Sequence, residues 1–193
     1  MAKQAVGILI PQQHKCRAVA CYFFDSTIIK NLQDRMLKLY KDIEGTLHYW
    51  ETWDKDEKTG IIHWGVVGDK GENEEIKSSL LTSFRKKTQK LVDEKIAEGY
   101  EEIEDTYILL IEYKVEDMGT PEDLDKRHRL EDRMNEVLGW TGLGHCDGGS
   151  IGSGTMEACC FVVDFDAAKK VIEQDLKGTE FENYTKIFDE KEE

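Results

Sequence analysis

Residues 47–67 read LHYWETWDKDEKTGIIHWGVV, and this stretch decides the fold of the first half of the chain. Aromatic and β-branched residues fill its two ends, and the polar run Asp54–Gly60 separates them. This pattern is typical of a β-hairpin, in which a polar turn joins two antiparallel strands. It predicts strands over residues 47–53 and 61–67, and a further strand over 73–77 follows a glycine turn.

The segments on either side of this hairpin carry helix signals. Over 28–43, apolar residues recur at a spacing of three and four, which predicts a helix, and strand-like runs precede it over 6–10 and 17–24. After the hairpin, a second apolar face predicts a helix over about 79–98 that ends at Gly99. The residues of that face are Leu80, Leu81, Phe84, Leu91, Val92 and Ile96.

The last part of the chain alternates strand and helix signals. Thr120, followed by Pro121 and two acidic residues, is a strong helix start, and the glycine-rich run 148–154 predicts a turn. The elements that we expect are strands over 106–113, 141–147, 155–163 and 182–188 and helices over 120–139 and 164–178. Their order, strand-helix-strand-strand-helix-strand, is the ferredoxin-like or split-βαβ pattern.

We therefore expect an α+β fold in three parts. Residues 1–45 form a strand and helix segment that packs on the next unit. Residues 46–105 form an antiparallel sheet with one helix, and residues 106–193 form a ferredoxin-like α+β unit.

Short motifs follow one another through the hairpin and its helix. In chain order they are Tyr49-Trp50-Glu51, Trp64-Gly65, Gly68-x-Lys70-Gly71 and a helix end Lys95-Ile96-Ala97-Glu98-Gly99-Tyr100. In these features the chain over 46–103 resembles the WGR domain, a small module best known from poly(ADP-ribose) polymerases. The resemblance implies a WGR-like sheet plus helix, and a Trp and an Arg that contact a DNA end. Val66 stands where the family has this Arg, and it lacks the permanently charged fork that binds phosphate.

The charge of the chain is strongly negative and unevenly spread. The chain has 26 Lys and Arg against 40 Asp and Glu, a net charge of −14. Residues 1–45 carry seven basic and four acidic residues (+3), 46–105 nine and 15 (−6), and 106–193 ten and 21 (−11). Such a chain is repelled by nucleic acid and by anionic membranes unless a local basic patch survives. An acidic surface suits a basic protein partner instead.

Targeting signals and cysteines point to a reducing compartment. No apolar run approaches the roughly 18 residues of a membrane span, and the first residues lack the apolar core of a secretory signal. We therefore expect a cytoplasmic, bacterial-type protein that has no contact with a membrane. The chain has five cysteines, an odd number, and we expect no disulfide framework and no metal site.

The run 140–155 contains the best candidates for a ligand site. Its glycines expose backbone N–H groups that can hold an anion, and polar side chains stand between them. These candidates are His145, Asp147, Gly149, Ser150 and Ser153. The alternative, which we favour, is a long structural hairpin, because the glycines lead into a strand and match no phosphate-loop spacing.

A second set of candidates belongs to a nucleic-acid interpretation. Its members are Trp64 in the hairpin and Arg85, Lys86, Lys87 and Lys90 in the following helix. The alternative for Trp64 is a side chain that packs the hairpin on this helix, and we prefer it. The histidines are scattered without a catalytic or metal-ligand spacing, so we expect no catalytic residue and no cofactor.

These observations favour a non-catalytic interaction protein that presents an acidic surface to a protein partner, in the manner of an immunity protein or inhibitor. The first alternative is a nucleic-acid-associated WGR module. The second is a small-ligand binder or enzyme that uses the glycine-rich segment 147–155. A low-salt and high-salt pull-down discriminates the first two, and substitution of Asp147 tests the third.

Overall fold

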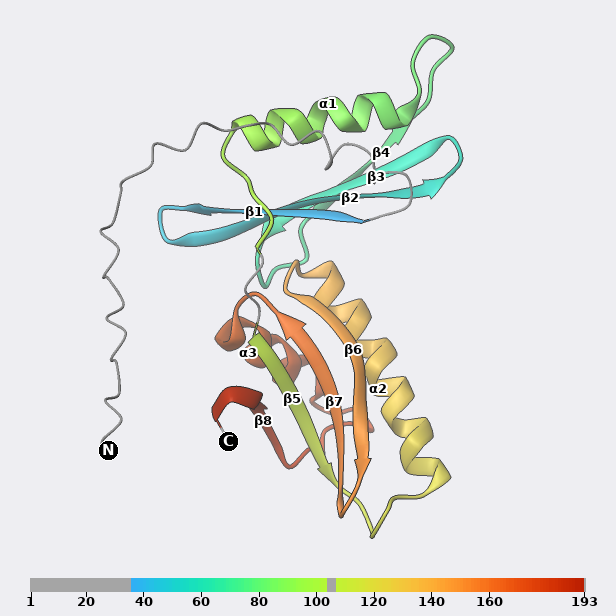
Figure 1. Cartoon of the computed structure of the whole chain (residues 1–193), viewed down its shortest axis with the longest axis vertical. Coiled ribbons are helices and arrows are strands. Elements are labelled where there is room, and N and C mark those ends of the chain that lie inside the picture. Colours follow the sequence, from blue (N-terminus) through green and yellow to red (C-terminus); the bar gives the residue numbers. More distant parts are fainter. Residues whose placement is uncertain (1–35, 104–106, 193) are drawn as a thin grey trace, which may run out of the picture.

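Within residues 36–103 and 107–192, which the computed structural model describes, the chain is α+β. It contains two four-stranded antiparallel sheets and three α-helices in this part. Figure 1 shows two units, with α1 on the outer face of the first sheet and α2 and α3 beside the second. The predicted α+β class is confirmed. None of the described helices is both long and apolar enough to cross a membrane.

The first sheet is a meander of consecutive strands in the order β1-β2-β3-β4. Its strands are β1 (Leu37–Ile43), β2 (Thr46–Asp56), β3 (Thr59–Val66) and β4 (Glu72–Lys77). The predicted hairpin and third strand are confirmed. The turn of the hairpin is shorter than the polar run because the Asp56 carboxylate accepts the Lys58 N–H at 2.8 Å and lets β2 continue to Asp56.

The helix predicted over 28–43 is wrong where the structure describes it, because 37–43 form strand β1. Leu39 and Tyr40 are adjacent and both buried, which a strand achieves when both faces of its sheet are covered. Here α1 covers one face and the second unit the other (Figure 1). Residues 28–35 and the strands expected over 6–10 and 17–24 lie outside the described residues.

Helix α1 (Phe84–Ala97) begins later than the apolar spacing predicted. The Ser83 hydroxyl accepts the Lys86 N–H and caps the helix at this point. Phe84 and Val92 are each only 2 % exposed. Leu80 and Leu81 were expected on this buried face, and that expectation is wrong, because both precede the helix and are exposed.

The second unit follows the predicted order of strands and helices. Its elements are β5 (Tyr107–Lys114), α2 (Pro121–Trp140), β6 (Gly144–Gly152), β7 (Thr155–Val162), α3 (Phe165–Leu176), β8 (Lys186–Asp189) and the short 3-10 turn Glu190–Glu192. Its sheet has the order β6-β7-β5-β8 with every neighbour antiparallel. Thr120 caps α2 in a reciprocal pair with Asp123, as the helix start predicted.

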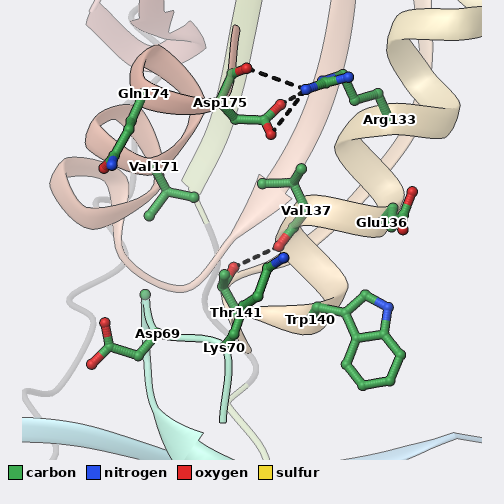
Figure 2. Close-up of a pocket in the computed structure, with 11 residues that line it drawn as sticks. Asp69, Lys70, Arg133, Glu136, Val137, Trp140, Thr141, Val171, Gln174 and Asp175 are labelled. Atoms are coloured by element: carbon green, nitrogen blue, oxygen red, sulfur yellow. Dashed lines mark hydrogen bonds and ion pairs between the residues drawn. The ribbon is translucent and has the colours of Figure 1, made fainter. Parts of the chain in front are cut away.

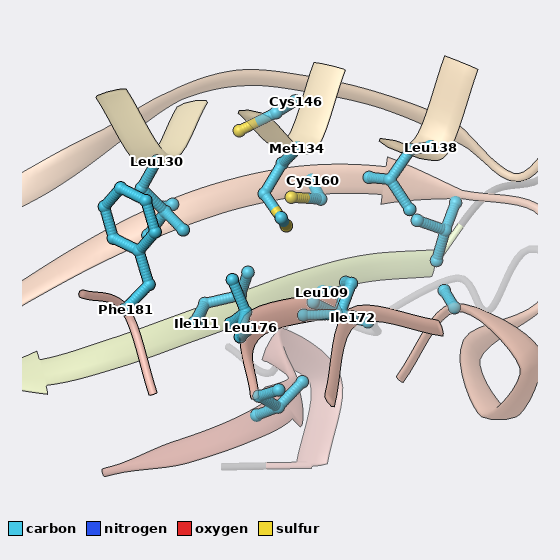
Figure 3. Close-up of a cluster of buried hydrophobic side chains, with 14 of the residues drawn as sticks. Leu109, Ile111, Leu130, Met134, Leu138, Cys146, Cys160, Ile172, Leu176 and Phe181 are labelled. Atoms are coloured by element: carbon cyan, nitrogen blue, oxygen red, sulfur yellow. The ribbon is translucent and has the colours of Figure 1, made fainter. Parts of the chain in front are cut away.

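The larger hydrophobic core lies between this sheet and its two helices (Figure 3). Alternate residues of β7 are buried, which is the period of a strand with one covered face. The residues of α2 and α3 that complete this core are Leu130, Met134, Leu138, Ala168, Ile172 and Leu176, each fully buried.

The glycine-rich turn predicted over 148–154 is wrong, because most of this run is part of strand β6. The turn itself is formed by Ser153 and Gly154. A Cβ atom on Gly144 or Gly149 would overlap a backbone carbonyl of β7. The glycines therefore serve close contact between two strands, and a bulge between Cys146 and Gly149 adjusts the register.

Candidate functional site

A chain of buried polar side chains crosses the face of the first sheet that meets the second unit. His63 Nδ1 lies 2.6 Å from Glu51 Oε1, and His63 Nε2 lies 2.9 Å from the Tyr49 hydroxyl oxygen. The ammonium of Lys38 lies 2.9 Å from the other oxygen of Glu51. Tyr49, Glu51 and His63 are at most 2 % exposed. These contacts connect β1, β2 and β3, and Lys38, whose side chain is 17 % exposed, is the member that reaches water.

The Tyr49 hydroxyl sits at the end of this chain that is nearer the second unit. Burial raises the pKa of Tyr49 above its ordinary value, and the charge of Glu51 raises it further. The same two causes, in the same order, raise the pKa of Tyr40. The Tyr40 hydroxyl donates a hydrogen bond to the Gly142 carbonyl at 3.0 Å. Both phenols are therefore neutral hydrogen-bond donors at physiological pH.

The second unit closes over this chain with the last residue of α2 and the residues that follow it. The Trp140 ring lies edge-on to His63 at 5.1 Å and to Trp53 at 6.2 Å between centroids. The Thr141 carbonyl accepts the Gly68 N–H at 2.9 Å. Gly142 has a φ of +65°, and a Cβ there would overlap the Tyr49 ring. The junction of the two units is therefore a specific contact.

Two glycines of the WGR-like motifs make room for the same tyrosine. A Cβ on Gly65 would lie 3.1 Å from the Tyr49 ring, and a Cβ on Gly71 would overlap the Tyr49 hydroxyl. Side chains at these positions would displace Tyr49 from His63. The motif residues thus have a packing role in the first sheet and at its junction with the second unit.

The Glu51–His63–Tyr49 contacts have the order of a proton relay, but the hydroxyl at their end is buried away from any external molecule. A ring protonated on Nδ1 donates to Glu51 and accepts from Tyr49, and such a Glu-His-Tyr arrangement resembles the order of an acid-base relay. Because Tyr49 is only 1 % exposed, no external atom meets its hydroxyl. The geometry supports a role in holding the two units together.

A cleft of about 500 Å³ opens beside the junction, between the β3–β4 loop and helices α2 and α3. It is lined by Gly68, Asp69, Lys70, Arg133, Glu136, Val137, Trp140, Thr141, Val171, Gln174 and Asp175. Figure 2 shows the Arg133–Asp175 pair at one end and Asp69, Lys70 and Trp140 toward the other. The Tyr49 hydroxyl also lies 3.4 Å from the Asp69 carbonyl oxygen, so the buried chain ends at the cleft wall.

The charges of the cleft nearly balance. Arg133 is held by Asp175, with Nε 2.6 Å from one carboxylate oxygen and Nη2 3.2 Å from the other. Among the described residues, the Lys70 ammonium has no hydrogen-bond or ion-pair partner. The negative charges of Asp69 and Glu136, which also line the cleft, offset the positive charge of Lys70. The cleft therefore suits a small polar molecule better than a highly charged phosphate.

The five candidates from the glycine-rich run lie along the edge strand β6 and its turn. His145 stacks on Phe161 with 5.4 Å between centroids, and the Ser150 hydroxyl donates to Glu157 at 2.9 Å. Arg127 donates to the Gly149 carbonyl at 2.9 Å. Asp147 is exposed at the bulge, and Ser153 lines a separate hollow of about 400 Å³ at the turn. The run forms part of a β-ladder, which is the structural hairpin that the sequence favours over an N–H cradle.

The nucleic-acid candidates divide into Trp64, which packs inside the first unit, and four cations of helix α1. Trp64 is half-buried and packs with the core cluster of Ile62 and Val92 between the first sheet and α1. The four cations lie together on the first turns of α1. Arg85 pairs with Asp54 at 2.7 Å, Lys90 with Glu94 at 3.4 Å, and Lys87 donates to a backbone carbonyl, while Lys86 is exposed.

The cysteines of the second sheet sit on different faces, as adjacent strand residues must. Cys160 is buried in the core opposite Cys146, and Cys159 is half-buried on the other face. A hydrogen bond to Cys146 and burial raise the pKa of the Cys160 thiol well above its ordinary value. Within the described ranges, no three or more metal-ligating side chains gather at one point.

No protein-family profile, curated protein or solved structure matches this chain. The resemblance to the WGR domain therefore stays a prediction from its motifs.

Sequence reasoning missed the Glu51–His63 contact because no short motif joins these residues. A signal was nevertheless present. Tyr49, Glu51 and Trp53 alternate along one strand and share a face, and the hairpin register places His63 directly opposite Glu51. Pairing the hairpin residue by residue would have brought this polar set together. The contact with Trp140 depends on the second unit and has no local signal.

Proposed function

We propose that the protein is a non-catalytic cytoplasmic interaction protein that presents an acidic surface to a basic protein partner, as an immunity protein or inhibitor does. The observation that carries this proposal is a stripe of carboxylates on helix α2. Glu122, Asp125, Asp132 and Glu136 are exposed, and their spacing places them on one face of the helix. We call these four residues the α2 stripe.

The ion pairs of the second unit support this interpretation. Its arginines are engaged by carboxylates outside the stripe: Arg127 by Glu131, Arg129 by Glu180 and Arg133 by Asp175. The stripe itself has no ion-pair partner among the described residues. Unpaired carboxylates on a rigid helix attract a basic partner and accelerate its association.

For the fold we propose the finer description that the motifs and the element order suggest. The first unit would be a WGR-like sheet and helix, and the second a ferredoxin-like split-βαβ unit. The sheet order β6-β7-β5-β8, in which each helix connects strands that flank a third, supports the second part.

The test compares two variants of equal net charge as baits in a lysate of the native host. The first, Glu122→Gln/Asp125→Asn/Asp132→Asn/Glu136→Gln, neutralises the α2 stripe. The second, Glu57→Gln/Glu72→Gln/Glu74→Gln/Glu98→Gln, neutralises four carboxylates of the first unit. We expect wild type and the second variant to recover the same basic protein, and the first variant to recover it about tenfold less.

The recovered protein is then purified, and its affinity is measured at low and high salt. Equal affinity for the two variants contradicts the proposal, and so does recovery of nucleic acid in place of a protein. The latter result favours a nucleic-acid-associated WGR module, for which the cluster of Arg85, Lys86, Lys87 and Lys90 is the specific observation.

A further inference from the structure

The most exposed apolar side chains of the described residues stand side by side in the loop between β4 and α1. Leu80 is 105 % exposed and Leu81 97 %. In Figure 1 this loop projects beyond the first sheet at the end of the molecule away from the second unit. Leucines elsewhere in the described chain are buried or half-buried, apart from Leu124 at 37 %. Apolar side chains presented in this way are typical of a binding element.

The loop is held in one shape by its own hydroxyl groups. The Ser79 N–H donates to the Thr82 carbonyl at 2.8 Å, and the Ser79 hydroxyl accepts the Thr82 N–H at 3.2 Å. The Ser78 hydroxyl accepts the Phe84 N–H at 3.0 Å, which ties the two ends of the loop together above a buried Phe84. The two leucines are therefore displayed by a preorganised turn.

The segment that carries the leucines is basic in sequence, although the turn end of the β2–β3 hairpin with Asp54 and Asp56 lies beside it, where the Ser78 N–H donates to the Lys58 carbonyl at 2.9 Å. No acidic residue lies between Glu75 and Asp93, the longest such interval in the described part of the sequence. Lys77 and Lys87 meet at the base of the loop, where the Lys87 ammonium donates to the Lys77 carbonyl at 2.7 Å. Among the described residues, Lys86 and Lys87 have no carboxylate partner, whereas the Lys77 ammonium pairs with Glu75 at 2.9 Å.

The charge of the molecule is therefore distributed unevenly between its two ends. Residues 106–193 carry a net charge of −11 (ten basic against 21 acidic residues). The described part of this segment, residues 107–192, lies at the other end of the molecule from the leucine loop (Figure 1). Because charges are screened over roughly 8 Å at physiological salt, the distant acidic unit repels an anion bound at the loop only weakly. An anionic surface repels the acidic unit and attracts the basic loop, so the molecule approaches it with the loop facing the surface.

We propose that Leu80, Leu81 and the adjacent Lys77, Lys86 and Lys87, here called the apolar-basic tip, dock on the surface of an anionic lipid membrane. The binding surface must accept two apolar side chains and several ammonium groups at once. A lipid headgroup layer does so, since leucines enter the acyl boundary while lysines contact anionic headgroups. Nucleic acid offers the charge, but it leaves the leucines in water. This surface is separate from the α2 stripe, and it does not depend on the function proposed above.

The test is cosedimentation of the full chain with vesicles of phosphatidylcholine, with and without phosphatidylserine. We expect binding to the anionic vesicles that weakens as salt is added. Leu80→Ser/Leu81→Ser should reduce the partition coefficient at least about tenfold, because two apolar side chains no longer enter the lipid. Lys86→Glu/Lys87→Glu should reduce it by a similar or larger factor, since each substitution replaces attraction to anionic headgroups with repulsion.

Matched controls separate the tip from general effects. Lys169→Glu/Lys170→Glu on α3 makes the same change in net charge, and Leu124→Ser removes an exposed leucine of α2. Both should bind anionic vesicles as wild type does. Circular dichroism should show all four variants folded, because every substituted side chain is at least partly exposed.

The proposal is overturned if wild type does not sediment with anionic vesicles, or if the tip variants and the controls bind equally. Loss of binding by the lysine variant alone, together with wild-type binding to DNA, would assign the cations to nucleic acid. Loss of a purified protein partner on Leu80→Ser/Leu81→Ser, without vesicle binding, would assign the leucines to a protein pocket.

Discussion

At the scale of single residues, His63 is the side chain on which the junction depends. It joins Glu51 to Tyr49 and contacts Trp140 of the second unit. His63→Ala leaves the Glu51 carboxylate buried without its second partner. We expect this variant to lose about 3 kcal/mol of unfolding free energy, measured by urea denaturation.

His128→Ala is the matched control, because His128 is exposed on α2. Its stability should stay within about 0.5 kcal/mol of wild type. If the two histidine variants are equally stable, the buried chain does not contribute to the junction. Glu51→Gln, which keeps a hydrogen-bonding side chain, should lie between wild type and His63→Ala.

At the scale of elements, alanine substitutions of Gly149 in β6 and of Gly139 in α2 should have opposite effects on stability. A Cβ on Gly149 would overlap the Glu157 carbonyl, whereas a Cβ on Gly139 has nothing within 4 Å. Gly149→Ala should therefore destabilise the protein by about 1–3 kcal/mol, because the β6–β7 ladder must shift. Gly139→Ala should stabilise it by about 0.5 kcal/mol, because alanine favours the helix.

Thermal unfolding of the two alanine variants measures this contrast. A Gly149→Ala protein as stable as wild type would mean that β6 lies farther from β7 than described. The same contact explains why Asp147→Asn is a cleaner probe of a ligand at the glycine-rich segment than any substitution of Gly149. Asp147 is exposed and can lose its charge without moving a strand.

At the scale of the whole molecule, buried phenols make stability depend on alkaline pH. Burial raises the pKa values of Tyr40 and Tyr49 at the junction and of Tyr113 in the second unit. A phenol with a raised pKa in the folded state stabilises fully below its ordinary pKa of 10.0. This stability is lost as the pH rises above that value, since the unfolded chain then releases protons more readily. Urea midpoints should therefore fall steadily above pH 10.

Tyr40→Phe should make this decline shallower, although it also removes the hydrogen bond to Gly142 and lowers the midpoint at neutral pH. Tyr107→Phe, at a side chain that is 44 % exposed, should leave the profile as in wild type. A Tyr40→Phe profile parallel to that of wild type would contradict a buried neutral phenol at the junction. Because Tyr40 connects both units, we also expect wild type to unfold in one transition.

Elements with strong local signals were predicted correctly. The hairpin over 47–67, strand β7 and the capped start of α2 depend on neighbours in the sequence, namely alternation, turn residues and the Thr120–Asp123 pair. Strand β1 was taken for a helix because apolar residues at both of its faces imitate a helical spacing. That pattern became a strand because α1 and the second unit cover opposite faces of the first sheet.

The sequence by itself determined the α+β class, the order of most elements and the acidic balance, because these depend on local preference and on composition. The tertiary structure alone decided which side chains meet. It placed His63 between Glu51 and Tyr49 under Trp140, and it left Leu80 and Leu81 exposed. The physical reason is that burial depends on what covers a face. Residues far apart in the chain supply that cover, and no local pattern records their approach.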